Sequence, residues 1–208
     1  MIRIVKRHAP AALRNRDAIL AMLRRVLPAR GTVLELGSGT GEHAVFLAGE
    51  FPELTWQPSD PDPEARDSIE AWAAEARRPN LLAPLHLDLL APAWRRRSAD
   101  AILCVNVLHV AESACAAALV EGAAGVLAPG GPLVVYGPFA PGPAPLAGRL
   151  ARIDATVRAA DPRLGVPRLD EFLASAARVG LALAEDGPGA EEGDRIVVLR
   201  PPLTPPAR

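Results

Sequence analysis

The chain has 208 residues, of which 50% are hydrophobic and 23% are charged, and its formal net charge at pH 7 is −1. This length suits one α/β domain with a full core, and the near-neutral charge excludes the strong attraction to nucleic acid or anionic membrane that basic proteins show. Two cysteines are too few for a disulfide framework or a zinc cluster, and no apolar run resembles a signal peptide or a membrane span, so we expect a cytoplasmic protein.

Hydrophobic periodicity predicts helices and strands in alternation. After an irregular segment at 2–13, helices are expected at about 15–27, 41–49, 63–77, 112–126, 146–160 and 168–179. Strands are expected at 32–36, 54–58, 82–87, 101–105, 132–136, 181–184 and 195–199. Strands that alternate with helices pair in parallel through right-handed crossovers. The short link 186–194 indicates that the last strand is antiparallel and inserts beside the fifth.

The sequence therefore predicts a Rossmann-like, doubly wound α/β fold in three layers. Its seven-stranded sheet is mostly parallel, and its last strand is antiparallel. We expect residues 1–208 to form a single domain, in which 1–28 is an N-terminal helical segment. Ligands bind to such sheets at the carboxyl ends of the strands, near the point where the strand order reverses.

The stretch Glu35-Leu36-Gly37-Ser38-Gly39-Thr40-Gly41 follows the first strand. Glycine lets the backbone turn sharply and lie against a ligand, and the amides that open the next helix carry partial positive charge. A dinucleotide fold has Gly-x-Gly-x-x-Gly instead. The order Glu-x-Gly-x-Gly-x-Gly resembles motif I of the class I S-adenosylmethionine (SAM)-dependent methyltransferases, in which the loop lies along the methionine and ribose of SAM. Another nucleotide, or a flexible loop without a ligand, is the alternative.

Three later strand ends carry polar side chains. A carboxylate at Asp60, after the second strand, can accept hydrogen bonds from both ribose hydroxyls; the alternative is that it helps Asp62 to cap the next helix. Asp88 follows the third expected strand, where methyltransferases commonly place an acid or amide toward the adenine amino group; a turn residue is the alternative. Asn106 follows the fourth strand, where methyltransferases hold the methionine end of SAM or the acceptor.

Several segments are similar to one branch of this class, the DUF938 family (methyltransferase-like protein 26 type). They are 10–16, 35–43, 56–60, 106–109, 136–139 and 161–166. The resemblance covers about residues 8–180. It implies that Asn15 and Arg16 lie near the mouth of the cofactor site, where Arg16 can pair with the methionine carboxylate; a solvated helix face is the alternative for Arg16. The chain departs from the family at 140–145 and 187–193, both of which are expected to face the acceptor pocket.

SAM carries an activated methyl group, so the protein chiefly aligns donor and acceptor, and a general base is needed only when the acceptor must lose a proton. His109 is the first candidate for this base, followed by Tyr136, His43 and Asp154. The alternative for His109 is a structural bond to a backbone carbonyl, and His43 is expected to lie beside the cofactor without a catalytic role. The histidines show no metal-ligand spacing, so no metal is expected.

We thus expect a SAM-dependent methyltransferase that acts on a small molecule, with 140–180 as a lid on the substrate side. The candidate catalytic residues are His109 and Tyr136. The candidate cofactor-binding residues are Asn15, Arg16, Glu35, Gly37, Ser38, Gly39, Thr40, Gly41, His43, Asp60, Asp88 and Asn106. A SAM-binding partner protein without catalysis and a nucleotide-dependent oxidoreductase are the alternatives. No nucleic acid or membrane partner is expected.

Overall fold

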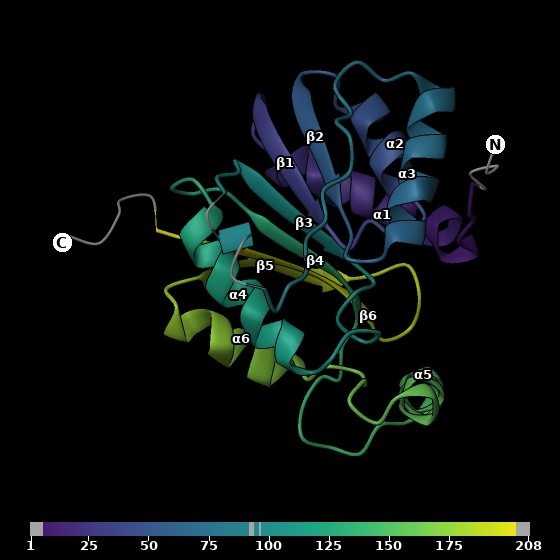
Figure 1. Ribbon diagram of the computed structural model, residues 1–208. Helices are drawn as coiled ribbons and strands as arrows, with labels where there is room; N and C mark the ends of the chain where they lie inside the picture. Colours follow the sequence, from purple (N-terminus) through teal and green to yellow (C-terminus); the bar gives the residue numbers. More distant parts are fainter. Residues whose placement is uncertain (1–5, 92–93, 96, 203–208) are drawn as a thin grey trace.

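The computed structural model describes residues 6–91, 94–95 and 97–202 (Figure 1). The first residues of the expected irregular segment, 2–5, lie outside this range. The helices are α1 (Pro10–Val26), α2 (Glu42–Glu50), α3 (Pro63–Ala76), α4 (Ala114–Val126), α5 (Gly148–Ala160) and α6 (Leu169–Arg178). The strands are β1 (Gly31–Leu36), β2 (Leu54–Ser59), β3 (Ala101–Val105), β4 (Leu133–Pro138), β5 (Ala182–Pro188) and β6 (Asp194–Arg200).

The strands form one sheet in the order β2-β1-β3-β4-β6-β5. β1 pairs in parallel with β2 and β3, and β3 pairs in parallel with β4. β6 is antiparallel to β4 and lies between β4 and β5, as the sequence predicts. The strand order reverses at β1, so the loops after β1 and β3 open at the point where doubly wound sheets bind ligands.

The prediction of a third strand at 82–87 is wrong, because no continuous strand forms there. Its segment runs along the open edge of β2 but makes only isolated parallel bridges there, through Leu81 and Leu85. Pro84 lies between them and has no N–H to donate, so a continuous ladder cannot form. The described residues therefore form a sheet of six strands rather than seven.

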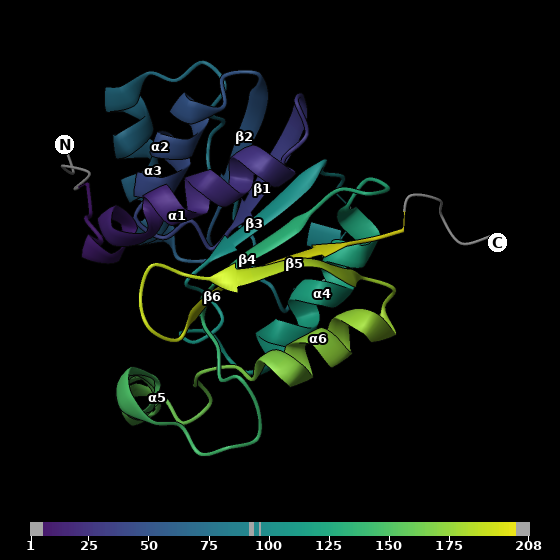
Figure 2. The same cartoon turned by 180° about the vertical axis from the view of Figure 1, so that it is seen from behind.

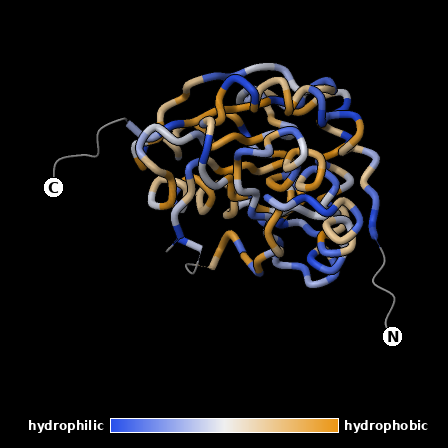
Figure 3. Tube along the Cα trace, turned by 90° about the horizontal axis from the view of Figure 1, so that it is seen from above, coloured by the Kyte–Doolittle hydropathy of each residue, from blue (hydrophilic) through white to orange (hydrophobic). Residues whose placement is uncertain are grey.

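Helices cover both faces of the sheet, which confirms the three layers (Figures 1 and 2). One core cluster packs β-strand residues such as Ile102 and Val135 against α4 and α6, through Leu119 and Phe172. The other packs the alternate strand residues against α1 and α2. Strands buried on both faces read as continuous apolar runs, and the interior of the molecule is accordingly the hydrophobic part of Figure 3. The fully buried Cys104 is part of this core, as expected.

Two helices differ from their expected extent or burial. α1 begins at Pro10, five residues before the expected start, because proline at the first helical position has no N–H to leave unpaired. α5 has no fully buried residue, although it lies in the segment expected to form a lid. The other helix of that segment, α6, buries Phe172 and Ala176 in the core beside α4. Of the two helices in the expected lid segment, only α5 therefore projects beside the strand ends, as Figure 2 shows.

Antiparallel pairing brings the start of β6 to the same edge as the ends of the parallel strands. Pro138, at the end of β4, is paired with Asp194, the first residue of β6. Polar residues at the start of β6 consequently lie at the same edge of the sheet as those that follow β1, β2 and β3. No helix in the described part of the chain combines the length and apolar character needed to cross a membrane.

Candidate functional site

The glycine loop after β1 holds all three of its glycines at positive φ. The angles are 68° at Gly37, 55° at Gly39 and 91° at Gly41, a region that side chains other than glycine rarely adopt. A Cβ at Gly37 would lie 2.5 Å from a methyl of Val107, and one at Gly41 would lie 2.8 Å from the Ile69 Cα. A Cβ at Gly39 would meet no atom within 4 Å. The loop is therefore packed at both ends and open in the middle.

Side chains within the loop bind the protein rather than point away from it. The buried Ser38 donates its backbone N–H to the Ser59 carbonyl at 2.8 Å, and its Oγ accepts the Ser59 N–H at 3.2 Å. The Thr40 hydroxyl lies 3.2 Å from a carboxylate oxygen of Glu42, and its carbonyl accepts the Ser68 hydroxyl at 2.8 Å. These contacts fix the loop, and they leave its backbone as the surface that a ligand would meet.

Asp60 joins the end of β2 to the glycine loop. One carboxylate oxygen accepts the Gly39 N–H at 2.9 Å, and the other accepts the Asp62 N–H at 3.0 Å. The side chain thus supports the start of α3, which was the alternative role, and also reaches the open part of the loop. Since each carboxylate oxygen has a further lone pair, ribose hydroxyls can still donate to it.

Glu35 lies beneath the loop and is buried. Its carboxylate accepts the indole N–H of Trp56 at 2.5 Å. Burial raises the pKa of Glu35 from 4.5 to about 7, although the Trp56 hydrogen bond opposes this rise. The side chain therefore ties the end of β1, where the loop begins, to Trp56 of β2.

His43 is hydrogen-bonded to Asn15, whereas with Arg16 it shares only the border of a hollow. His43 Nε2 lies 2.8 Å from Asn15 Oδ1, and because an amide oxygen only accepts, the ring donates. Burial lowers the pKa of His43 from 6.5 to about 4, so this ring is neutral at pH 7. The Arg16 guanidinium lies over the Phe46 ring, 4.9 Å from its centre, and the hollow that it borders lies between α1 and α2.

A hollow of about 270 Å³ opens beside the end of β3. Asn106 and His109 border it, together with Asn15 from α1. Asn106 has φ of 57°, which asparagine tolerates better than most residues. Burial lowers the pKa of His109, and no hydrogen bond joins its ring to another residue in the described ranges. The structure thus brings together the strand-end asparagine, the first candidate base and one of the two residues expected at the cofactor mouth.

Tyr136 enters the same hollow, but its hydroxyl is already bonded on both sides. It donates to a carboxylate oxygen of Asp194 at 2.7 Å and accepts the Ala190 N–H at 3.1 Å. Burial, with Asp194 next to it, raises the pKa of Tyr136. Asp194 also accepts from Arg149 at 2.7 Å. A phenol held in this way serves the network, and it is poorly placed to take a proton from an acceptor.

Sequence reasoning missed four charged residues that border this hollow: Arg14, Arg149, Glu191 and Asp194. Glu191 and Asp194 come from the loop and strand start between β5 and β6; the sequence predicts that 187–193 faces the acceptor pocket, but it names no residue there. Asp194 directly precedes the expected strand 195–199. Since that strand was expected to be antiparallel, the residue before it could have been placed at the edge that carries the site.

Asp88 is exposed, and it accepts the Leu90 N–H at 2.9 Å, which is the turn contact named as its alternative. Asp154, the last candidate base, accepts from Arg158 and from the Val166 N–H. It is therefore occupied within the segment around α5. In the described ranges, no three His, Cys, Asp or Glu side chains gather as a metal site would require.

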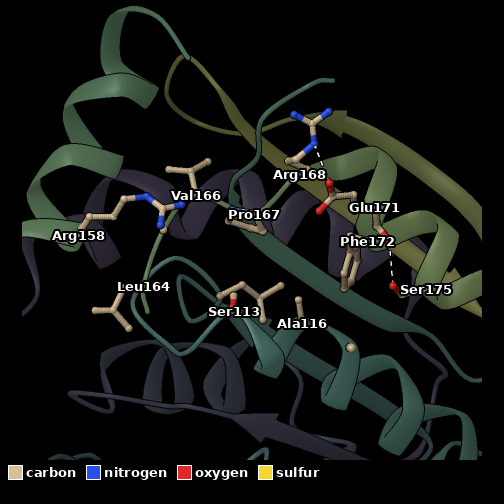
Figure 4. A pocket seen from close by; sticks show the side chains of 13 residues that line it. Ser113, Ala116, Arg158, Leu164, Val166, Pro167, Arg168, Glu171, Phe172 and Ser175 are labelled. Atoms are coloured by element: carbon tan, nitrogen blue, oxygen red, sulfur yellow. Dashed lines mark hydrogen bonds and ion pairs between the residues drawn. The ribbon is translucent and has the colours of Figure 1, made fainter. Parts of the chain in front are cut away.

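A second hollow, of about 260 Å³, lies between α4, α6 and the segment that precedes α6. Figure 4 shows Arg168 paired with Glu171 at its border and Phe172 at its base. None of the site residues predicted from the sequence borders it. The candidate site is therefore the glycine loop with the hollow beside Asn106.

Solved methyltransferase structures share this fold. An O-methyltransferase family protein from Burkholderia thailandensis superposes with a TM-score of 0.74 at 18% identity, over 90% of this chain and 58% of its own. CalO1, a methyltransferase in calicheamicin biosynthesis in its SAH-bound form, superposes with a TM-score of 0.68 at 22% identity, over 88% of this chain and 53% of its own. An O-methyltransferase family 2 protein from Planctomyces limnophilus DSM 3776, in complex with apigenin, superposes with a TM-score of 0.67 at 21% identity, over 90% of this chain and 62% of its own. The chain spans little more than half the length of these proteins.

The family comparison agrees with the motifs. Residues 6–188 match the family described as protein of unknown function DUF938. This match covers most of the chain, including the glycine loop, Asp60, Asn106 and His109. The chain therefore belongs to the DUF938 family and has the Rossmann-like fold of the SAM-dependent methyltransferases.

Proposed function

We propose that this chain is a class I SAM-dependent methyltransferase that transfers a methyl group to a small-molecule acceptor. The observation that carries the proposal is the glycine loop itself. Its three glycines have positive φ, its middle is open, and the Asp60 carboxylate accepts the Gly39 N–H there. A loop of this kind at the switch point of a parallel sheet is a typical binding site for a nucleotide-like ligand. Solved relatives in fold include SAM-dependent enzymes, which supports the same assignment.

The residues present fit SAM. The open backbone at Gly39 admits close approach, and Asp60 would hold the ribose through its free lone pairs. Asn106 and Asn15 would border the methionine end, and Asp88 would face the adenine. Bound SAM supplies an activated methyl group on a sulfonium, so the protein has only to align it with the acceptor.

The hollow beside Asn106 is the proposed acceptor site. Its volume of about 270 Å³ is slightly below the ~300 Å³ at which pockets for drug-sized ligands begin. It is bordered mainly by polar and charged groups. A small polar molecule therefore suits it better than a polymer. We place the reaction in the cytoplasm, on the sequence expectation alone.

Calorimetry with purified protein tests the cofactor. We expect SAM and S-adenosylhomocysteine to bind, and NAD and NADP to give no heat. Binding of NAD or NADP instead would favour the oxidoreductase reading. A protein that binds SAM but transfers no labelled methyl to a panel of small acceptors would support the partner protein without catalysis.

His109 is the proposed general base, whereas we assign Tyr136 to the Asp194 network. Because burial lowers the pKa of His109 below 6.5, the ring is neutral at pH 7 and can take a proton. For an acceptor that loses its proton early, kcat/KM is expected to be flat near pH 7. It should fall about tenfold per pH unit below the His109 pKa, because the protonated ring cannot act as a base.

Replacing His109 by Gln should lower kcat about 100-fold or more and remove this acid limb. S-adenosylhomocysteine affinity, measured by calorimetry, should be unchanged. The exposed His86 provides the matched control, since His86→Gln should leave both the rate and its pH profile intact. Full turnover by His109→Gln would show that His109 is not the base.

A further inference from the structure

A carboxylate of the protein occupies a site between two arginines at the border of the hollow. Glu191 Oε1 lies 2.6 Å from Arg14 Nε, and Glu191 Oε2 lies 2.5 Å from Arg149 Nη2. Arg14 lies on α1, Arg149 on α5 and Glu191 in the β5–β6 loop, which passes between those two helices in Figures 1 and 2. All three residues border the hollow that contains Asn106 and His109.

Arg149 is anchored independently of Glu191. Its Nη1 donates to Asp194 at 2.7 Å and to the Glu192 carbonyl at 2.9 Å. Asp194 is only 5% exposed and also accepts from Tyr136, so it is a fixed partner. The Nη2 of Arg149, which faces Glu191, is the part of its guanidinium that remains for another ligand. Arg149 would therefore keep its orientation if Glu191 moved away.

Glu191, in contrast, can be displaced. Its side chain is 31% exposed, and its backbone carbonyl accepts the Asp194 N–H at 3.0 Å, so displacement requires only rotation of the side chain while the loop stays in place. In the described ranges, its carboxylate is bonded to the two arginines alone. A part-exposed ion pair of this kind contributes little to stability, so moving the Glu191 carboxylate into solvent costs little free energy.

From this geometry we propose that Arg14 and Arg149 form a subsite for a carboxylate of the small-molecule acceptor, and that Glu191 occupies this subsite until the acceptor displaces it. The proposal rests on the proposed function, because it names the substrate class of the same site. The four charges at the hollow, two guanidinium groups and the carboxylates of Glu191 and Asp194, balance. An acceptor that replaces Glu191 must carry a negative charge to preserve this balance.

The chemistry of the two arginines favours a carboxylate. A guanidinium offers several N–H donors in one plane, which match the two oxygens of a carboxylate. Here the donors come from opposite sides of the hollow and already hold such a group. An acceptor bound by its carboxylate would extend from the arginines into the hollow that contains His109 and Asn106, where its reacting atom must lie.

Calorimetry with benzoate, and with benzamide as its neutral counterpart, tests the proposal. Measurements with and without S-adenosylhomocysteine would use wild type, Glu191→Gln and the matched control Glu192→Gln. Glu192 is the exposed neighbour in the same loop, and it contacts Arg149 only through its backbone carbonyl, which the substitution keeps. Removing the internal competitor should tighten benzoate binding about tenfold in Glu191→Gln. Benzamide should gain nothing, Glu192→Gln should match wild type, and adding Arg14→Gln to Glu191→Gln should remove the gain.

The proposal is overturned if benzoate binds Glu191→Gln no more tightly than wild type, or if benzamide gains equally. The methionine end of SAM also carries a carboxylate, so S-adenosylhomocysteine is compared with 5′-methylthioadenosine, which lacks it. If Glu191→Gln tightens only S-adenosylhomocysteine, the arginines bind the cofactor, and the acceptor assignment fails. If benzoate behaves as expected while neither SAM nor S-adenosylhomocysteine binds wild type, the carboxylate subsite stands and the methyltransferase proposal falls.

Discussion

Asp60→Ala is expected to weaken SAM and S-adenosylhomocysteine binding at least 100-fold. The carboxylate is the charged acceptor at the open part of the glycine loop, and it fixes the Gly39 amide at 2.9 Å. Hydrogen bonds to a charged group contribute about 1.5–3 kcal/mol each, so two lost ribose contacts account for this loss. Calorimetry measures it, with the exposed Asp67 on α3 as the matched control in Asp67→Ala.

Asp60 also supports the fold, so the ribose contact must be separated from a structural effect. A double-mutant cycle does this with 5′-methylthioadenosine and its 2′,3′-dideoxy analogue. Wild type should lose affinity when the hydroxyls are removed, whereas Asp60→Ala should bind both ligands equally weakly. If the hydroxyls contribute as much in Asp60→Ala as in wild type, Asp60 acts only through the loop and the start of α3.

Glu35→Gln is expected to make the free energy of unfolding less dependent on pH. The folded-state pKa of about 7 lies above the ordinary value of 4.5, because the carboxyl is buried. The folded protein therefore holds this proton more tightly than the unfolded chain between pH 4.5 and 7. The stability that the protonated form provides is fully present below pH 4.5 and is lost as the pH rises through 7.

The loss amounts to about 3 kcal/mol across this window, since one pKa unit corresponds to about 1.4 kcal/mol. Relative to wild type, Glu35→Gln should thus gain about 3 kcal/mol between pH 4.5 and pH 8, whatever constant effect the amide has. Urea denaturation at both pH values measures this difference. The exposed Glu70→Gln should show no such gain, and an equal gain in both variants would contradict the assignment to Glu35.

The buried His43 titrates in the opposite sense, which is why the comparison with wild type is needed. Its pKa of about 4 in the folded protein lies below the ordinary 6.5. The unfolded chain binds this proton more tightly, so His43 makes stability rise with pH between about 4 and 6.5. The slopes of Glu35 and His43 partly cancel in wild type.

Several features of the site were predictable because they depend on short stretches of sequence. The glycine loop needs positive φ at fixed spacing, and the three glycines supply it. Asn106 directly follows the apolar run 101–105, and Asp60 comes two residues after the expected strand 54–58, so recognising each strand also located its end. The parallel pairing of the earlier strands and the antiparallel direction of the last strand followed from the lengths of the connections. The strand at 82–87 failed for a local reason, since Pro84 interrupts its ladder.

Other features depend on which side of a helix a residue faces. A shift of one or two positions along the helix changes that side. Consecutive residues of an α-helix lie about 100° apart around its axis. On α1, Arg14 and Asn15 reach the hollow, while Arg16 turns to Phe46 of α2. The family resemblance indicated the right segment, but the start of α1 and its packing decided which arginine borders the site.

The sequence by itself determined the fold class, the glycine loop and the polar residues at the ends of β2 and β3, because these follow from local periodicity and spacing. Only the tertiary structure brought Arg14, Arg149, Glu191 and Asp194 to one hollow. Arg149 is 45 residues from Asp194, and Arg14 is 177 residues from Glu191. No local pattern links residues so far apart, and their meeting depends on β6 running against β4, which places its first residue and the preceding loop at the edge where the parallel strands end.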